Sequence, residues 1–222
     1  MTISKPVVDY RKLRLSNLNT ETFQHLKLLL YWPLYGLLFL FVERFYPAQH
    51  YTVMHCALDD LIPFCEWFLI PYLLWFVYLV GMHLYTLLYD VDSFTRMMKH
   101  IILTYSIAIV IYLIWPTCQE LRPETFARDN FLTRFIAGFY QFDTNTNVCP
   151  SIHVIGSLAV MEAALWCRRL SKRTKVGFVI VAVLICISTV FMKQHSVLDI
   201  LAALPICLLA HFLFFRKERV KC

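Results

Sequence analysis

Charged residues are scarce in this sequence, and their scarcity sets the class of the protein. Only 16% of the 222 residues are Asp, Glu, Lys or Arg, whereas 59% are hydrophobic and the mean hydropathy is +0.59. A soluble domain carries about 25% charged residues, so the composition favours an integral membrane protein instead. The 18 Phe and 12 Tyr residues agree with this, since aromatic side chains gather at both membrane interfaces.

Several other features are absent. The sequence contains no Cys-x-x-Cys pair, no internal repeat and no low-complexity segment. The eight cysteines therefore predict neither a metal-binding pattern nor a disulfide framework, although pairing among the four on the predicted outer side stays open. No cleavable signal peptide is visible, because the N-terminus is polar and basic and the first apolar run begins near Leu26. The length indicates a single domain.

Six apolar runs predict six membrane-spanning helices and thus an all-α integral membrane bundle. Several runs are shorter than the roughly 20 residues that a bilayer core requires, so flanking residues must complete them. The runs are 26–42, 67–88, 97–115, 152–166, 176–192 and 197–215. We accordingly divide the chain into a cytoplasmic N-terminal segment (1–25), a six-helix membrane domain (26–215) and a basic cytoplasmic tail (216–222).

Lys and Arg residues are distributed unevenly between the two sides of the predicted bundle. With the N-terminus in the cytoplasm, 16 of the 21 Lys and Arg residues lie on the cytoplasmic side. Cytoplasmic loops of membrane proteins carry such an excess, so both termini are predicted to be cytoplasmic in a multi-pass protein of the plasma membrane. The net charge of +6 is therefore a topology signal, and no nucleic-acid partner is expected.

Polar residues gather at one depth, the outer ends of the predicted spans, in or beside the loop 116–150. They are Arg122, Ser151, His153, Lys193, His195 and Asp199. His195 and Asp199 are four residues apart, so on a helix they share a face and the carboxylate can accept the proton of one ring nitrogen. The other nitrogen is then free to act as a nucleophile or a base.

Each of these residues also has an ordinary structural explanation. A histidine can be interfacial, Asp199 can cap its helix, and Arg122 can contact lipid headgroups. The convergence of two histidines, an aspartate, an arginine and a serine at one depth favours an outward-facing active site instead. A metal site built from His153, His195 and Asp199 is disfavoured, because no further cysteine or carboxylate is placed to complete it.

Two other classes of membrane protein are disfavoured as well. Intramembrane serine proteolysis needs a serine and a base, but Ser151 and His153 are only two residues apart and no Gly-x-Ser-Gly turn occurs. A transporter needs a polar track across the membrane, and none continues through the inner half. Glu162 is expected to pair or snorkel near Arg168 and Arg169 at the inner end of its span.

The order and spacing of the outer polar residues resemble three motifs of the type 2 phosphatidic acid phosphatase superfamily. That superfamily includes sphingomyelin synthases, inositol-phosphorylceramide synthases and vanadium haloperoxidases. Its motif K-x6-R-P is similar to the Arg122-Pro123 pair here, with Trp115 at the lysine position. Its motif P-S-G-H reads Pro-Ser-Ile-His at 150–153.

The third motif of the superfamily is S-R-x5-H-x3-D. Here it reads Ser-Thr at 188–189, followed by His195 and Asp199. The run 193–199 is most similar to the inositol-phosphorylceramide-synthase-like branch, and the resemblance covers roughly residues 63–205. Six spans and an outward-facing site also match the family.

The resemblance implies a phosphohistidine mechanism that uses no metal and no other cofactor. His195 would attack phosphorus, and Asp199 would hold its imidazole in the productive tautomer. His153 would protonate the departing alcohol and then activate the incoming water or alcohol. Arg122 and Ser151 would hold phosphate oxygens, as phosphoryl transfer requires.

Two of the three cations of the family pattern are missing, because Trp115 and Thr189 occupy their positions. A phosphomonoester carries nearly two negative charges at neutral pH and a diester carries one, so fewer cations suit a diester. Lys193 is a candidate to replace one lost cation. We expect a lipid phosphoesterase that hydrolyses a lipid phosphate, with headgroup phosphotransfer from a phosphodiester lipid as the alternative. The expected partners are a phospholipid or other lipid phosphate and the surrounding membrane lipids.

Overall fold

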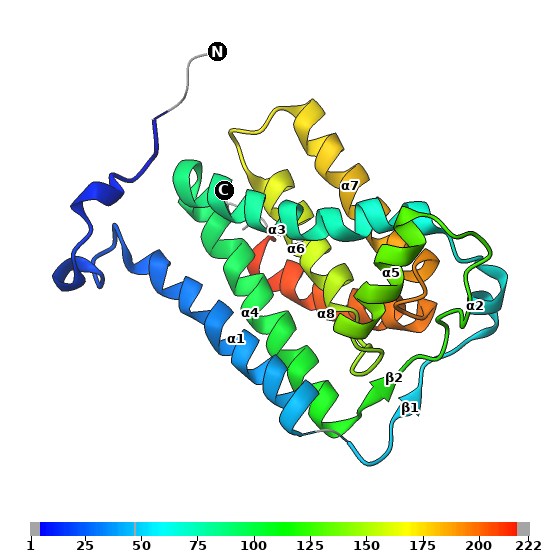
Figure 1. The fold of residues 1–222 in the computed structure, drawn as a ribbon. Helices are drawn as coiled ribbons and strands as arrows, with labels where there is room; N and C mark the ends of the chain where they lie inside the picture. The colour runs from blue at the N-terminus through cyan, green and yellow to red at the C-terminus, as the bar shows by residue number, and fades with distance from the viewer. Residues whose placement is uncertain (1–4, 47, 217–222) are drawn as a thin grey trace.

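The computed structural model describes residues 5–46 and 48–216, and these residues are mostly helical (Figure 1). Of the predicted basic tail, residues 217–222 lie outside the described ranges. The α-helices of the described chain are α1 (Tyr31–Leu40), α2 (Ala57–Leu61), α3 (Leu69–Tyr89), α4 (Val91–Ile114), α5 (Phe131–Phe142), α6 (Ile152–Trp166), α7 (Lys172–Phe191) and α8 (Val197–Phe214). The shorter elements are the 3-10 helices η1 (Tyr10–Lys12), η2 (Leu15–Asn17), η3 (Gln24–Leu30) and η5 (Glu66–Phe68), the π-helical turn η4 (Phe41–Phe45), and the strands β1 (Thr52–Val53) and β2 (Thr117–Cys118).

Five helical segments of the described chain are long and apolar enough to cross a membrane. They are Gln24–Phe45, Glu66–Tyr89, Val91–Ile114, Lys172–Phe191 and Val197–Phe214. These segments correspond to the first, second, third, fifth and sixth predicted spans, so a helical membrane protein is confirmed. The fourth predicted span is α6, which is apolar but has only 15 residues. A total of six spans therefore stays a prediction.

Helix α6 is short but occupies the centre of the bundle. It packs against α3, α4, α7 and α8, and side chains such as Val154, Ile155 and Val160 are fully buried. Because other helices surround it, its length need not match the thickness of the lipid. The longer helices expose many large apolar side chains instead, for example Val77 of α3 and Leu208 of α8, where lipid would cover them.

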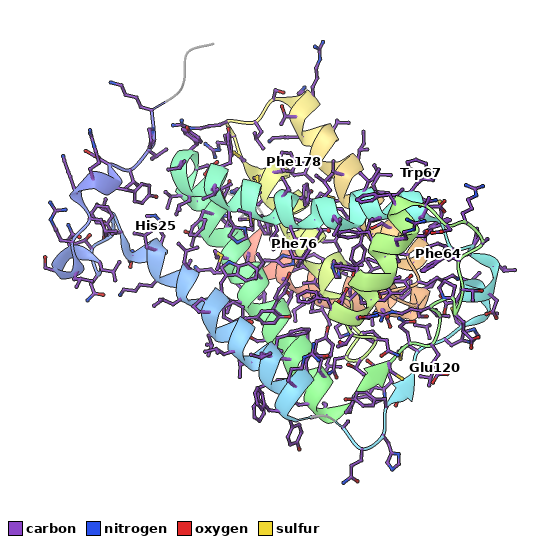
Figure 2. The ribbon with its side chains drawn as sticks, in the orientation of Figure 1. His25, Phe64, Trp67, Phe76, Glu120 and Phe178 are labelled. Carbon is purple, nitrogen blue, oxygen red and sulfur yellow. The ribbon has the colours of Figure 1, made fainter. Side chains whose placement is uncertain are left out.

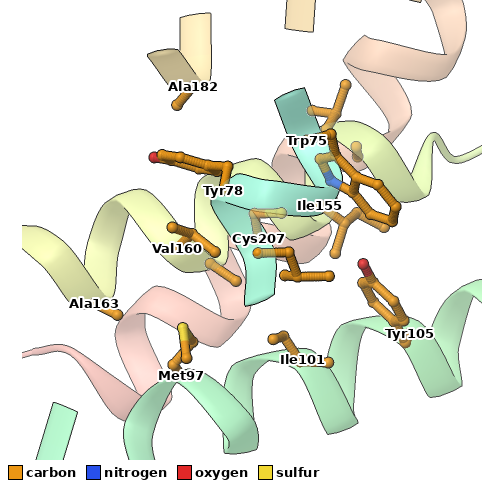
Figure 3. Packing of buried hydrophobic residues seen from close by; sticks show 14 of the residues in the cluster. Trp75, Tyr78, Met97, Ile101, Tyr105, Ile155, Val160, Ala163, Ala182 and Cys207 are labelled. Carbon is orange, nitrogen blue, oxygen red and sulfur yellow. The ribbon is translucent and has the colours of Figure 1, made fainter. Parts of the chain in front are cut away.

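The core between these helices combines aromatic and small side chains. Figure 3 shows Trp75 and Tyr78 of α3 near Ile155 and Val160 of α6, with Tyr105 of α4 on the facing side. Aromatic rings of this size bury a large apolar area, which is why small residues must face them.

Gly156 allows α6 to approach two of these aromatic side chains. A Cβ atom at this position would lie 2.6 Å from Tyr105 Oη and 3.0 Å from Trp75 Nε1. Gly156→Ala is therefore expected to lower the free energy of unfolding by about 1–3 kcal/mol, the usual cost of overpacking. Gly81→Ala is the matched control, because nothing lies within 4 Å of its added Cβ and alanine favours a helix. An unchanged thermal midpoint of Gly156→Ala in detergent would contradict this packing.

The half of the bundle remote from β1, β2 and α5 contains a polar cluster that the sequence did not predict. Glu162 of α6 lies 3.2 Å from Nδ1 of His100 and 3.1 Å from Nδ1 of His211. The expectation that Glu162 pairs with Arg168 or Arg169 is wrong, because α4 and α8 bring a histidine to each of its carboxylate oxygens.

A cap of loops, short helices and strands covers the other end of the bundle. Figure 1 shows α2, α5 and both strands at this end. β1 pairs in parallel with β2, with Thr52 opposite Thr117 and Val53 opposite Cys118. Helix α5 packs against η5, at the start of α3. The residues predicted to form the site lie in or beneath this cap.

Candidate active site

The turn between α7 and α8 fixes the backbone of His195. Lys193 takes a left-handed conformation with a φ of 54°, which reverses the chain. The N–H groups of Gln194 and His195 then both donate to the carbonyl of Thr189, at 3.0 and 3.2 Å. His195 Nδ1 lies 3.0 Å from Asp199 Oδ2. The predicted contact is thus present, although His195 lies in the turn before α8 and does not share a helical face with Asp199. The contact leaves Nε2 as the ring nitrogen available to a substrate.

Asp199 is held in place independently of the histidine. Its Oδ2 also accepts a hydrogen bond from the N–H of Ser196, at 3.0 Å, and its side chain is fully buried. Its carbonyl accepts from the N–H of Ser151, at 3.2 Å, which joins the start of α6 to the start of α8. These bonds fix the carboxylate that orients the imidazole of His195.

His153 approaches His195 from the first turn of α6. The centroids of the two imidazole rings are 5.7 Å apart, so both rings lie at one site. The His153 ring lies against the rings of Tyr72 and Trp75, with both centroids at 4.5 Å. Its Nδ1 is buried and has no hydrogen-bond partner among the described residues. The two histidines are 42 positions apart in the sequence, and the fold brings them together.

One pocket contains both imidazole rings. It is lined by Phe39, Tyr72, Tyr112, Asp143, Thr144, Thr146, Asn147, Val148, Ile152, His153, Gln194 and His195. This lining, within the described ranges, includes no lysine or arginine. Asp143 supplies its carboxyl group, and Oδ2 accepts hydrogen bonds from Tyr72 Oη at 2.8 Å and from Gln194 Nε2 at 3.1 Å. Burial raises the pKa of Asp143, although the hydrogen bond from Tyr72 opposes the shift.

A model of the PAP2 superfamily matches residues 99–220, which is more than half of the chain. The chain belongs to the PAP2 superfamily. Members of this superfamily are phosphoesterases and phosphatases, so the pocket is the candidate site of a phosphatase-like phosphoesterase. The match includes all six residues predicted for the site, whereas α1 and α3, which supply Phe39 and Tyr72, precede it. No curated protein and no solved structure matches the chain.

Arg122, the arginine of the PAP2-like Arg-Pro pair, lies behind the pocket wall. Its guanidinium donates to the carbonyls of Tyr140, Asp143 and Thr144 at 2.8, 2.6 and 2.9 Å. It also donates from both Nε and Nη2 to the side-chain carbonyl of Gln194. These bonds tie the end of α5 to the turn that carries His195. Phosphate binding by Arg122 stays a prediction, and its contacts favour a positioning role.

Lys193 also lies away from the pocket. Its Nζ donates to the carbonyl of Asp59 in α2, at 2.7 Å, and burial lowers its pKa. Thr189, at the family's arginine position, is fully buried and donates to the carbonyl of Cys186. Neither position brings a cation to the pocket in this structure, so substrate binding by Lys193 stays a prediction that the geometry does not favour.

Asp59 holds the turn that carries His195, and sequence reasoning did not identify this role. Its Oδ2 accepts a hydrogen bond from Ser196 Oγ at 2.5 Å, and its Oδ1 accepts from the N–H of Val197 at 2.8 Å. Burial disfavours the ionised form, yet these hydrogen bonds outweigh it and lower the pKa of Asp59 overall. Helix α2 thereby caps the N-terminus of α8 from 137 positions away in the sequence.

Asp59→Asn is expected to lower kcat by about tenfold with little change in KM, because a charge-assisted hydrogen bond contributes about 1.5–3 kcal/mol and Asp59 does not touch the pocket. Asp60→Asn is the matched control, since the carboxylate of Asp60 is exposed and contacts only His55 among the described residues.

The contribution of Asp59 to stability should depend on pH. Because the pKa of Asp59 is depressed in the folded state, its carboxylate stabilises the fold at pH values above 3.8, its ordinary pKa. This stabilisation is lost as the pH falls through the lower pKa of the folded state. The thermal midpoints of wild type and Asp59→Asn should therefore converge in acid. Equal losses of kcat in Asp59→Asn and Asp60→Asn would contradict the role of Asp59 in holding the turn that carries His195.

Two pocket residues were also missed from the sequence. Asp143 belongs to no motif that the resemblance supplied, whereas Gln194 lies in the run 193–199 but was given no role there. The two side chains meet through a hydrogen bond across 51 positions. The polar run 143–147, directly before the motif at 150–153, is the signal that could have drawn attention to Asp143.

Proposed function

We propose that this protein is a membrane-embedded lipid phosphoesterase that hydrolyses a lipid phosphate through a phosphohistidine at His195. The observation that carries the proposal is the buried His195–Asp199 pair facing His153 in one pocket. A carboxylate on Nδ1 raises the electron density at Nε2 and fixes its direction, which is what a nitrogen nucleophile requires. The PAP2 match supports the same reaction class.

In the first step, Nε2 of His195 attacks phosphorus and the bond between phosphorus and the ester oxygen breaks. His153 gives its proton to the departing alkoxide, so the lipid alcohol leaves as a neutral molecule. In the second step, His153 takes a proton from water while the water oxygen attacks phosphorus, and the bond between phosphorus and Nε2 of His195 breaks. Inorganic phosphate leaves, and both histidines return to their starting states.

We favour the first turn of α6 as the group that stabilises the phosphate oxygens. Helix α6 begins without a side-chain hydrogen bond to its free N–H groups, and Ile152 and His153 line the pocket. Free N–H groups and the helix dipole make such an end an anion site. Ser151 Oγ is buried beside it and lacks a partner among the described residues, so a phosphate oxygen could satisfy it.

The alternative function is transfer of a phosphoalcohol headgroup from a phosphodiester lipid, as in the inositol-phosphorylceramide-synthase-like branch. The observation that favours it is Asp143, a carboxyl group in a pocket whose described lining includes no lysine or arginine. A carboxylate repels a phosphate dianion more strongly than a phosphodiester monoanion. An alcohol would then replace water in the second step.

One experiment separates the two functions. Purified protein is incubated with phosphatidic acid and, separately, with phosphodiester lipids in the presence of an alcohol acceptor. Release of inorganic phosphate from the monoester supports hydrolysis, and appearance of the headgroup on the acceptor lipid supports transfer. Absence of turnover with both lipid classes would overturn the proposed function.

We further propose that the protein lies in the plasma membrane with both termini in the cytoplasm and the cap outside. The asymmetric distribution of Lys and Arg supports this orientation. An impermeant thiol reagent added to intact cells should label Cys56 in the cap, which is partly exposed. Cys149 is buried and cannot serve as the probe. Labelling of Cys56 only after permeabilisation, read by mass spectrometry, would reverse the topology.

A further inference from the structure

The exposed surface of α5 has an aromatic side. Phe131, Phe135 and Phe142 are 79%, 43% and 78% exposed. At roughly 100° per residue these three positions fall within about 40° of one another, so they form one stripe along the helix. We call these three residues the aromatic stripe. Arg134 lies on the polar part of the exposed surface, and Ile136 is fully buried on the opposite side.

The buried side of α5 is anchored to the ends of the spans. Ile136 packs in a cluster with Leu69 and Tyr72 of α3 and with Met192, where α7 ends. Helix α5 also packs against η5, which carries the exposed side chain of Trp67. Figure 2 shows Trp67 at this end of the molecule. The stripe thus adjoins the lipid-facing surface of α3 at the depth where aromatic residues meet the membrane interface.

The size and charge of α5 fit a helix that lies in the interface plane. Its 12 residues are too few to cross a bilayer core of about 30 Å. Arg128 and Arg134 have side chains that are each 73% exposed, and they pair with Glu66 and Asp129 at the surface. A helix with one apolar and one polar side binds at the boundary between headgroups and acyl chains.

The C-terminal end of α5 continues into the catalytic pocket. The residue that follows it, Asp143, lines the pocket. Tyr140 Oη donates to the carbonyl of Met192 at 2.6 Å, next to the turn that holds His195. A lipid whose chains lie along the stripe therefore has its headgroup beside the pocket wall.

We propose that the aromatic stripe of α5 binds the interfacial region of the membrane leaflet on the active-site side and that the lipid substrate reaches the pocket along this helix. The second half of this statement rests on the proposed phosphoesterase function, whereas the membrane contact does not. The bound partner is lipid, because the stripe continues the lipid-facing surface of the spans.

The kinetic test compares a lipid with a water-soluble substrate. In the double variant Phe131→Ser with Phe135→Ser, kcat/KM for phosphatidic acid in mixed micelles should fall by at least about tenfold through KM, since burial of a Phe side chain in lipid is worth this much or more. Turnover of p-nitrophenyl phosphate should fall by no more than about threefold. The control with leucine at both positions should retain lipid turnover. Equal losses on both substrates, or no loss on the lipid, would overturn the proposal.

A second measurement does not depend on turnover. The variant Phe135→Trp is placed in vesicles that contain dibrominated phosphatidylcholine, and its fluorescence is compared with that of the wild type. Additional quenching in the variant supports contact with lipid. Equal quenching in the variant and the wild type would mean that the stripe faces water, and it would overturn the proposal. Cross-linking of Phe131→Cys between two copies in dilute vesicles would mean that the stripe binds a second copy, and it would overturn the proposal as well. If the wild type turns over no phosphoester, the function fails while this measurement still decides the membrane contact.

Discussion

Replacement of His195 with alanine is expected to lower phosphoester turnover by at least about a hundredfold. The side chain supplies the nucleophile, and loss of a nucleophile costs more than loss of an acid or base, whose usual contribution is about 10²–10⁴-fold. His153→Ala is expected to lose at least about a hundredfold as well, because the departing alkoxide then lacks its proton donor. The effect should appear in kcat, measured with a saturating lipid phosphate.

His55 offers a matched control for these two variants. It pairs with Asp60 at 2.8 Å, much as His195 pairs with Asp199 at 3.0 Å, but its side chain is exposed on the cap. His55→Ala should retain turnover within about twofold, since exposed ion pairs contribute little. Retention of activity in His195→Ala, with all variants inserted in the membrane, would eliminate His195 as the nucleophile.

Replacement of Arg122 is expected to have the second largest effect. Arg122→Met leaves the carbonyls of Tyr140, Asp143 and Thr144 and the side chain of Gln194 without their donor. A fully buried acceptor without a donor costs about 1–3 kcal/mol, but three of these four residues are only partly buried and water can reach them. We therefore expect the free energy of unfolding to fall by about 2–4 kcal/mol in total. Turnover should also fall by tenfold or more, because the same bonds hold the pocket wall against the His195 turn.

Arg122→Lys distinguishes positioning from phosphate binding. An ammonium group cannot reproduce a planar fork that reaches four acceptors, so lysine should rescue neither the thermal midpoint nor kcat. A phosphate ligand would behave differently: lysine would restore part of the activity, and the loss would appear in KM with an unchanged midpoint. Arg134→Met is the control, since Arg134 makes an exposed ion pair with Asp129.

The spans were predictable because each segment that crosses a bilayer must be apolar along its own length. Apolar runs identified the five long helical segments, and the predicted run 97–115 began late only because the polar first turns of α4 carry no hydropathy signal. Helix α6 was located with its bounds, yet its central position was not predictable, because burial among neighbouring helices leaves the same apolar pattern as contact with lipid.

Part of the site was predictable for a similar reason. The His195–Asp199 contact is local in sequence, so the spacing suggested it, but His195 lies in the turn before α8 and not on the helix. The Asp59–Ser196 and Asp143–Gln194 bonds join segments 137 and 51 positions apart, and no local pattern encodes them. A motif position fixes where Arg122 enters the fold but not which acceptors its guanidinium meets. For this reason its contacts with the protein could only come from the structure.

The most direct test of the phosphoesterase mechanism is to trap the covalent intermediate. Wild-type protein is mixed with lipid phosphate that carries ³²P and quenched within a turnover, and the labelled peptide is identified by mass spectrometry. We predict an acid-labile, hydroxylamine-sensitive phosphoryl group on His195, absent from His195→Ala. Turnover by the wild type without an acid-labile adduct, or the same adduct in His195→Ala, would contradict the account.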